Sequence, residues 1–301
     1  MKIIQSIFNI VLFGFEKIMT IFLIVIPEDL ALFLGKRFGD FLYFISKITP
    51  YGSFMEYNVR NTFYGTTKKE AIQIIKKGLK GLSLSLVEVF RFPLLNKNNF
   101  VKKVSFSGLD NLENAFNLGK GAIIASAHFG NWELLAASFP LLGYPFAVVV
   151  QDQINPVVNS FMNGRREKNG VTVISRYQDL RLLVKLMKRK YLLGMLVDQH
   201  GESNKVFGKF FGKRVSFPEG PAVLNVLCGC PIIPVFIIRQ ANGRHCIHFE
   251  EPIDTDSIKE TGRDKRIAVI SQLISDSLEK YILRYPEHWN WFYNRWDKLK
   301  E

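Results

Sequence analysis

Hydrophobic positions at the amino end of the chain form one long run. Residues 3–26 are almost continuously Ile, Leu, Val and Phe, and the part from 7 to 26 reaches the length of about 20 residues that a membrane-spanning helix needs. Glu16 and Lys17 interrupt the run near its middle, where each charge would cost roughly 2.5–3.5 kcal/mol inside a bilayer. The pattern therefore predicts a helix that spans a membrane, lies on or dips into its surface, or is buried as a cap of the domain.

A second apolar and aromatic stretch follows at residues 30–48. It carries Lys36, Arg37 and Lys47, whose charges suit lipid head groups. No small-residue cleavage site follows the first run, although a secretory signal would require one. We therefore expect residues 1–48 to form a hydrophobic membrane-associated segment and residues 49–301 to form the remaining domain.

Helical and strand-like patterns alternate along the rest of the chain. Apolar residues recur at three- and four-residue steps over 68–92, which predicts a helix that ends at Pro93. Beyond Gly108, short apolar runs rich in β-branched residues alternate with helical stretches. We predict strands at 122–125, 146–150, 172–175, 193–197, 232–238 and 245–249, and helices near 132–139, 157–168, 178–190, 222–227 and 263–285. This alternation indicates an α/β fold with a largely parallel central sheet flanked by helices.

Composition and charge narrow the classes of function. The 301 residues include 40 Lys and Arg against 27 Asp and Glu, a net charge of +13, yet 48% are hydrophobic and 26 are Phe. A chain that is both basic and apolar favours an anionic membrane surface over nucleic acid as its partner, and the globular mixture excludes a disordered or fibrous chain. The three cysteines, at positions 228, 230 and 246, have no metal-ligand spacing and cannot build a disulfide framework.

The stretch from Gly121 to Glu133 is the most informative for chemistry. A predicted strand brings His128 to the carboxyl end of the sheet, where the sites of parallel sheets form, and Gly130 permits a tight turn. Glu133 falls in the first turn of the next helix, and a carboxylate five residues from a histidine can reach the Nδ1–H of its ring. Nε2 would then take a proton, as in a catalytic triad whose serine is replaced by the substrate's own hydroxyl. A histidine at a strand end can equally be structural.

Three other polar segments are candidates for the same site. Arg165 and Arg166 precede a predicted strand, and two guanidinium groups can clamp a phosphate, stabilise an oxyanion or lie on a solvated helix face. Asp198 and Gln199 end another strand, at a position where sites form. Glu219 follows within a Phe-Pro-Glu-Gly-Pro segment.

Aromatic residues are concentrated at the carboxyl end. Three of the four tryptophans lie within residues 285–296. Such a run is suited either to an anchor in the membrane interface or to sealing the core.

In their order along the chain, these segments resemble the bacterial lipid A biosynthesis acyltransferases, the late lauroyl and myristoyl acyltransferases of the lysophospholipid acyltransferase superfamily. The resemblance covers almost the whole chain, from the hydrophobic amino end to the last tryptophan. The family's blocks occur here in the same order. Its His-x4-acid block falls on His128 and Glu133, its arginine before glycine on Arg166 and Gly170, and its Asp-Gln pair on Asp198 and Gln199. Its Phe-Phe-Gly block falls on residues 210–212, and its carboxyl-terminal tryptophan pattern falls on Pro286, Glu287, Trp289, Trp291, Arg295 and Trp296.

Two positions depart from the family's pattern. Tyr293 and Asn294 stand where many members carry His-Arg. Pro221 stands where the similar Pro-Glu-Gly block of glycerophosphate acyltransferases continues with threonine. Both departures lie outside the His-Glu dyad and concern the identity of the acceptor.

The resemblance implies transfer of a fatty acyl chain from an acyl thioester, typically on acyl carrier protein, to a hydroxyl of a lipid A precursor. His128 would remove the hydroxyl proton, Glu133 would orient and stabilise the imidazolium, and no metal or redox cofactor would be needed. The implied substrate-binding residues are Arg165, Arg166, Asp198, Gln199 and Glu219. The implied location is the cytoplasmic face of a bacterial inner membrane, with the enzyme held peripherally or by one N-terminal anchor.

Three alternatives remain open on the sequence alone. The same chemistry suits another acceptor, a lysophospholipid or a phosphatidylinositol mannoside with acyl-CoA as donor. A zinc hydrolase is disfavoured because no His-Glu-x-x-His motif occurs and the five histidines are scattered. A non-enzymatic membrane or nucleic-acid binder would suit the charge of +13, but the lysines are dispersed and no nucleic-acid recognition module is present.

Overall fold

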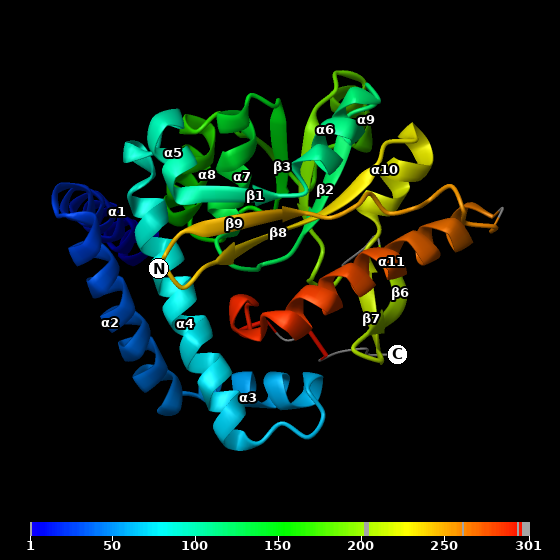
Figure 1. Cartoon of the computed structure of the whole chain (residues 1–301). Coiled ribbons are helices and arrows are strands. Elements are labelled where there is room, and N and C mark those ends of the chain that lie inside the picture. The colour runs from blue at the N-terminus through cyan, green and yellow to red at the C-terminus, as the bar shows by residue number, and fades with distance from the viewer. Residues whose placement is uncertain (1, 202–204, 261, 294, 297–301) are drawn as a thin grey trace.

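The computed structural model describes residues 2–201, 205–260, 262–293 and 295–296. A sheet with the strand order β1-β9-β8-β2-β5-β3-β4 lies at the centre of the molecule (Figure 1). Its neighbouring strands pair in parallel, except that β8 and β9 form an antiparallel hairpin. The predicted α/β class with a largely parallel sheet is therefore confirmed.

Six of the strands of this sheet lie within one residue of their predicted bounds. The strands are β1 (Val104–Ser107), β2 (Ala122–Ser126), β3 (Phe146–Val150), β4 (Thr172–Ser175), β5 (Leu192–Leu196), β8 (Ile232–Arg239) and β9 (His245–Phe249). The short edge strand β1 was not predicted, nor was the antiparallel pair β6 (Lys205–Phe210) and β7 (Lys213–Pro218). Lysine, arginine and glycine interrupt the apolar pattern of that pair, so its sequence gives no strand signal.

The helices cover both faces of the sheet and form a further layer on one side of it. They are α1 (Lys2–Val25), α2 (Glu28–Lys47), α3 (Pro50–Thr62), α4 (Lys68–Phe90), α5 (Lys97–Lys103), α6 (Leu109–Asn117), α7 (Trp132–Leu142), α8 (Pro156–Lys168), α9 (Leu180–Lys188), α10 (Gly220–Cys228) and α11 (Arg263–Arg284), with short 3₁₀ turns η1 (Phe92–Leu94) and η2 (Pro286–His288).

The central strand β2 is buried along its whole length and divides two apolar cores. Its side chains alternate between them, with Ile123 and Ala125 in one core and Ala122 and Ile124 in the other. The first core includes buried residues of α9, α10 and α11, and the second includes buried residues of α5, α6 and α7. A strand buried on both faces reads as an unbroken apolar run, which is why it was predictable.

Helices α1, α2 and α4 form an outer layer beside the sheet (Figure 1). Residues 5–25 of α1 are long and apolar enough to cross a membrane by length and composition alone. The helix is not a buried cap, because its large apolar side chains are mostly exposed: Ile7, Phe8, Ile10, Val11, Phe13, Phe15, Ile18, Ile21, Phe22 and Val25. Exposed aromatic residues continue along α2 at Phe33, Phe38, Phe41 and Phe44.

The charged pair in the middle of α1 is explained by contacts with the body of the protein. Oε1 of Glu16 lies 3.7 Å from an Nη of Arg165 on α8, and each side chain is only 10% exposed. The same guanidinium donates to the hydroxyl of Thr20, one turn further along α1. Lys17 pairs with the other oxygen of Glu16 and lies over the ring of Phe13. The polar residues in the middle of α1 therefore hold this helix against α8.

Candidate active site

His128 lies just beyond the carboxyl end of β2, near the middle of the sheet. The chain turns sharply after it at Gly130, whose φ is +59°. A Cβ at this position would come within 2.0 Å of the backbone oxygen of Ile237, so only glycine fits. Asn131 then caps α7 by accepting a hydrogen bond from the backbone N–H of Leu134. The predicted strand, turn and following helix are all present.

The carboxylate that holds the His128 ring belongs to Asp198, at the end of the neighbouring strand β5. Nδ1 of His128 lies 2.9 Å from Oδ1 of Asp198. The backbone N–H of His128 donates to Oδ2 of the same carboxylate at 3.1 Å. A carboxylate at Nδ1 requires the proton on that nitrogen, so the neutral ring carries its lone pair on Nε2.

Trp289, from the carboxyl-terminal segment, holds Asp198 from a third direction. Its indole Nε1–H donates to Oδ2 at 2.9 Å. Both Trp289 and Trp291 are at most 3% exposed, so these two tryptophans seal the core, and the alternative of an interfacial anchor is wrong for them. The segment also pairs with the turn after β2, because the N–H of Gly130 donates to the carbonyl of His288 and the N–H of Asn290 donates to that of His128.

The predicted contact between Glu133 and the His128 ring is not formed. Glu133 accepts two hydrogen bonds from the guanidinium of Arg166, with Nε 2.8 Å from Oε2 and Nη2 2.6 Å from Oε1. The indole N–H of Trp132 adds a third at 3.1 Å. Glu133 lies in the first turn of α7, where the guanidinium of Arg166 on α8, which donates two hydrogen bonds, is a better partner than an imidazole already held by Asp198. The geometry of the predicted His-Glu pair is therefore corrected to a His-Asp pair beside a Glu-Arg pair.

The charges around His128 set its proton affinity. Burial of the ring disfavours the charged form, but the Asp198 carboxylate outweighs burial and raises the pKa of His128 above its ordinary value of 6.5. Glu133 raises this pKa further, and Arg166 opposes the rise. Burial likewise acts to raise the pKa of Asp198, but His128 and the indole N–H of Trp289 lower it below its ordinary value, so the carboxylate stays ionised.

The remaining predicted residues are only partly brought together. Gln199 lies beside the ring, with Nε2 3.5 Å from Nδ1 of His128. Arg166 meets Glu133, whereas Arg165 points to α1 and is used there. Glu219 stands directly before α10, and within the described residues its side chain makes no hydrogen bond or ion pair with the others. The structure thus gathers His128, Asp198, Gln199, Glu133 and Arg166, and leaves Arg165 and Glu219 apart.

A buried ionic network beneath the turn was missed by the sequence reasoning. Both Nη groups of Arg239, at the end of β8, donate to Glu88 of α4 at 2.7 Å. Nε2 of His245 lies 3.1 Å from the same carboxylate, and the side-chain amide of Asn131 donates to it at 2.6 Å. Burial acts to raise the pKa of Glu88, yet His245 and Arg239 hold it well below its ordinary value. Through these contacts Glu88 of α4 holds Asn131, the cap of α7 next to His128, although the two residues are 43 positions apart in the chain.

The carboxyl-terminal segment contributes a fully buried cation. Arg295 is fully buried, and its guanidinium lies over the rings of Phe210 and Phe217, 5.3 and 4.9 Å from their centroids. An Nη of Arg295 lies 3.0 Å from Nδ1 of His200. Tyr293 takes the place of the family's histidine and accepts a hydrogen bond from the backbone N–H of His200, whereas Asn294 lies outside the described residues. The Phe-Phe-Gly segment and the arginine of the carboxyl-terminal pattern thus meet in one cluster.

Among the described residues, no group of three or more His, Cys, Asp or Glu side chains is placed to hold a metal ion. What the arrangement offers is an imidazole with one nitrogen fixed by a carboxylate, next to a buried ion pair. Such a group can accept a proton from a hydroxyl and return it to a leaving group.

Comparison with known proteins gives a consistent result. Residues 7–298 match the model of the family described as "Bacterial lipid A biosynthesis acyltransferase". The phosphatidylinositol mannoside acyltransferase of Mycolicibacterium smegmatis is 23% identical over 229 residues, which is 74% of this chain and 72% of that protein. The lipid A biosynthesis palmitoleoyltransferase of Escherichia coli is 24% identical over 272 residues, 90% of this chain and 86% of that protein.

The family match covers nearly the whole chain, and the similar proteins are acyltransferases that are named for two kinds of glycolipid. The protein is thus an O-acyltransferase of the lipid A or glycolipid type, and it belongs to the bacterial lipid A biosynthesis acyltransferase family.

Proposed function

We propose that the protein transfers a fatty acyl chain from the thioester of acyl carrier protein to a hydroxyl of a lipid A precursor, with His128 as the general base. The observation that carries this proposal is the pairing of His128 with Asp198, which fixes one ring nitrogen and leaves the other for the substrate. The position also supports it, because the carboxyl edge of a parallel sheet is where substrates bind.

The reaction requires two proton transfers at one nitrogen. Nε2 of His128 takes the proton of the acceptor hydroxyl as its oxygen attacks the thioester carbonyl. Asp198 stabilises the imidazolium that forms, since its carboxylate raises the pKa of the ring. When the tetrahedral intermediate collapses, the carbon–sulfur bond breaks, and the imidazolium returns its proton to the departing thiolate. General-base help of this kind contributes about 10²–10⁴ in rate.

Arg166 is proposed to bind an oxygen of the substrate while it holds Glu133. A guanidinium has five N–H donors. Three of those in Arg166 are used within the described residues, two by Glu133 and one by Oδ1 of Asn163. The other two are left for an acceptor phosphate or for the oxyanion of the intermediate. Glu133 keeps its proposed catalytic contribution through its charge, which favours the imidazolium, and not through contact with Nδ1.

A membrane location fits this substrate class. The exposed apolar faces of α1 and α2 suit a lipid surface, and the relatives are enzymes named for membrane lipids. We propose that the enzyme works at the cytoplasmic face of an inner membrane, where acyl carrier protein is present. The net charge of +13 suits both an acidic carrier protein and an anionic glycolipid.

Phosphatidylinositol mannoside with acyl-CoA as donor is the second candidate, because the Mycolicibacterium smegmatis relative is named for that acceptor. Purified enzyme should be offered each donor with each of three acceptors: a tetraacylated lipid A precursor, a phosphatidylinositol mannoside and a lysophospholipid. Mass spectrometry then detects one added acyl chain. We expect it on the lipid A precursor with the carrier-protein donor. Transfer to the mannoside alone would replace the proposal with its alternative.

A further inference from the structure

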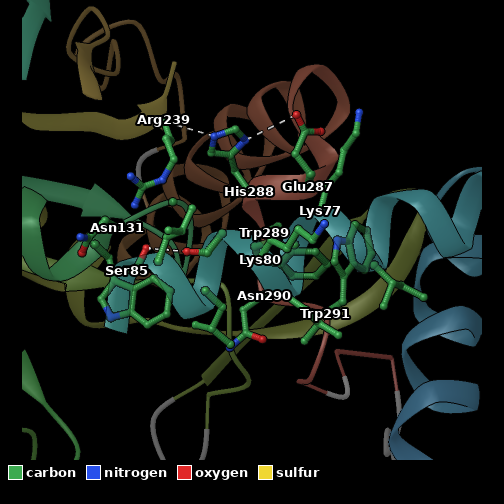
Figure 2. Close-up of a pocket in the computed structure, with 18 of the residues that line it drawn as sticks. Lys77, Lys80, Ser85, Asn131, Arg239, Glu287, His288, Trp289, Asn290 and Trp291 are labelled. Carbon is green, nitrogen blue, oxygen red and sulfur yellow. Dashed lines mark hydrogen bonds and ion pairs between the residues drawn. The ribbon is translucent and has the colours of Figure 1, made fainter. Parts of the chain in front are cut away.

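A cavity of about 550 Å³ lies next to the candidate active site, between α4 and the carboxyl-terminal segment (Figure 2). Its volume falls within the range of ligand pockets. His128, Asp198 and Glu133 do not line it, but Trp132 does. The Trp132 ring packs edge-on against that of His128, with centroids 5.3 Å apart. The cavity is therefore separate from the proton-transfer site and shares one wall with it.

The wall of the cavity is apolar and its rim is cationic. Aliphatic residues of α4 face the tryptophans of the carboxyl-terminal segment, which Figure 2 shows as Trp289 and Trp291. The ionised side chains that line the cavity are Lys36, Lys77, Lys80, Arg239 and Glu287, four cations against one carboxylate. His288 also lines it, and burial lowers the pKa of this ring, so it adds no charge.

The four cations differ in whether they are available to a ligand. Arg239 is not, because both its Nη groups are held by Glu88. Lys80 forms an ion pair with Asp40, with its Nζ 2.8 Å from Oδ1 of that residue. Lys36 and Lys77 have no carboxylate within ion-pair distance among the described residues, and both are exposed. An apolar wall below a row of lysines is complementary to a hydrocarbon chain that carries an anionic head group.

Two glycines of α4 face this region, and only one is explained by packing. A Cβ at Gly78 would lie 3.3 Å from the carbonyl of Glu287, a tight contact, so the close approach of the two segments favours glycine there. A Cβ at Gly81 would meet no heavy atom within 4 Å, although glycine weakens a helix interior. Gly81 lines the cavity, and its missing side chain keeps the cavity open.

We propose that this cavity binds a phosphate-bearing lipid, with one acyl chain along the apolar wall and the phosphate among Lys36, Lys77 and Lys80. Exposed apolar side chains of α2, such as Phe33 and Phe41, lie on the same helix as Lys36. This places the exposed apolar face of α2, which we propose to contact the membrane, beside the cationic rim of the cavity. Binding at this site does not depend on acyl transfer, so it can be tested whether or not the proposed reaction is correct.

Tryptophan fluorescence provides the test, because three of the four tryptophans line the cavity: Trp132, Trp289 and Trp291. Bromine atoms on an acyl chain quench an indole that they contact. The protein in detergent micelles should be titrated with brominated phosphatidylglycerol, which is anionic, and with brominated phosphatidylcholine of the same chains, which is zwitterionic. We expect the anionic lipid to quench at lower concentration.

Gly81→Leu is the blocking variant, and Gly164→Leu on α8 is its matched control, because a Cβ at either glycine meets nothing within 4 Å and only Gly81 lines the cavity. Quenching by the anionic lipid should weaken by about tenfold or more in Gly81→Leu and stay as in wild type in the control. Replacing Lys36, Lys77 and Lys80 together by Gln should weaken binding of the anionic lipid by about tenfold or more and leave binding of the zwitterionic lipid unchanged.

Unchanged quenching in Gly81→Leu, or equal quenching by the two lipids in wild type, would overturn the proposal. Thermal unfolding of each variant verifies that it is folded. The source of the lipid is read from competition with an unlabelled tetraacylated lipid A precursor. Relief of quenching assigns the site to the acceptor, and persistent quenching assigns it to a phospholipid of the membrane.

Discussion

Asp198→Asn is the substitution that most sharply separates the observed site from the one expected from the sequence. Two donors converge on Oδ2 of Asp198, the backbone N–H of His128 and the indole N–H of Trp289, at 3.1 and 2.9 Å. The amide oxygen of an asparagine would have to take that position, because an NH₂ group there would face two donors. Its NH₂ would then face Nδ1 of His128, which lies 2.9 Å from the present Oδ1.

The substitution should therefore change the tautomer of His128 and leave the shape of the site almost unchanged. With an NH₂ group as its partner, Nδ1 must accept a hydrogen bond, so the ring proton moves to Nε2 and the base is lost. The full contribution of general-base catalysis is then removed, and kcat should fall by about 10²–10⁴. Since the three hydrogen bonds are kept, the melting temperature should remain close to that of wild type.

The assay is acyl transfer followed by mass spectrometry, with thermal unfolding measured on the same preparations. His128→Ala is the reference for complete loss of the base, and Asp198→Asn should approach it. A kcat for folded Asp198→Asn within a few-fold of wild type would refute the role given to this carboxylate. It would return Glu133 to consideration as the partner of the ring during the reaction.

Three other consequences of the geometry can be measured. The base must be neutral and its pKa is raised, so kcat/KM should rise with pH through a midpoint above 6.5, and a midpoint well below 6.5 would contradict the pairing of His128 with a carboxylate. Breaking the buried pair of Glu133 and Arg166 from either side should lower the free energy of unfolding in urea by about 3 kcal/mol. The double replacement by Gln should cost less than the sum, and strict additivity would mean that the pair is not coupled. Glu16→Ala leaves Arg165 without its carboxylate and should expose the α1–α2 connection to limited proteolysis, whereas an unchanged digestion pattern would show that α1 is held by other contacts.

Much of the fold was predictable because the strands of the sheet are buried on both faces. An unbroken apolar run such as residues 122–125 has one simple interpretation once helical stretches flank it. The pair β6 and β7 was not predictable, because β6 packs on α11 and carries Lys205 and Lys209 on its exposed side. Its apolar residues gain their partners only from tertiary contacts.

The candidate site was predictable as a set of residues but not as a set of pairs. The position of His128 at a strand end, and of Asp198 at another, followed from the strand pattern. Their contact depends on β2 and β5 being neighbours in the sheet, which the chain order does not reveal. Sequence proximity favoured Glu133, five residues away, over a carboxylate 70 residues away.

The tryptophan that completes the site was the least accessible to sequence reasoning. Trp289 lay within a motif that suited a membrane interface or a core equally well. Its indole N–H reaches Asp198 only because the carboxyl-terminal segment pairs with the turn after β2. The one available signal was that a buried indole needs a hydrogen-bond acceptor, and Asp198 is the acceptor that the fold supplies.

The central claim is that this protein transfers an acyl chain with His128 as the base. The most direct test is acyl transfer by wild type and by His128→Ala, from an acyl carrier protein thioester to a tetraacylated lipid A precursor, read by mass spectrometry. We predict one added acyl chain with wild type and a rate lower by about 10²–10⁴ with the folded variant. Equal transfer by the two proteins would contradict the role of His128, and transfer by neither would contradict the proposed substrates.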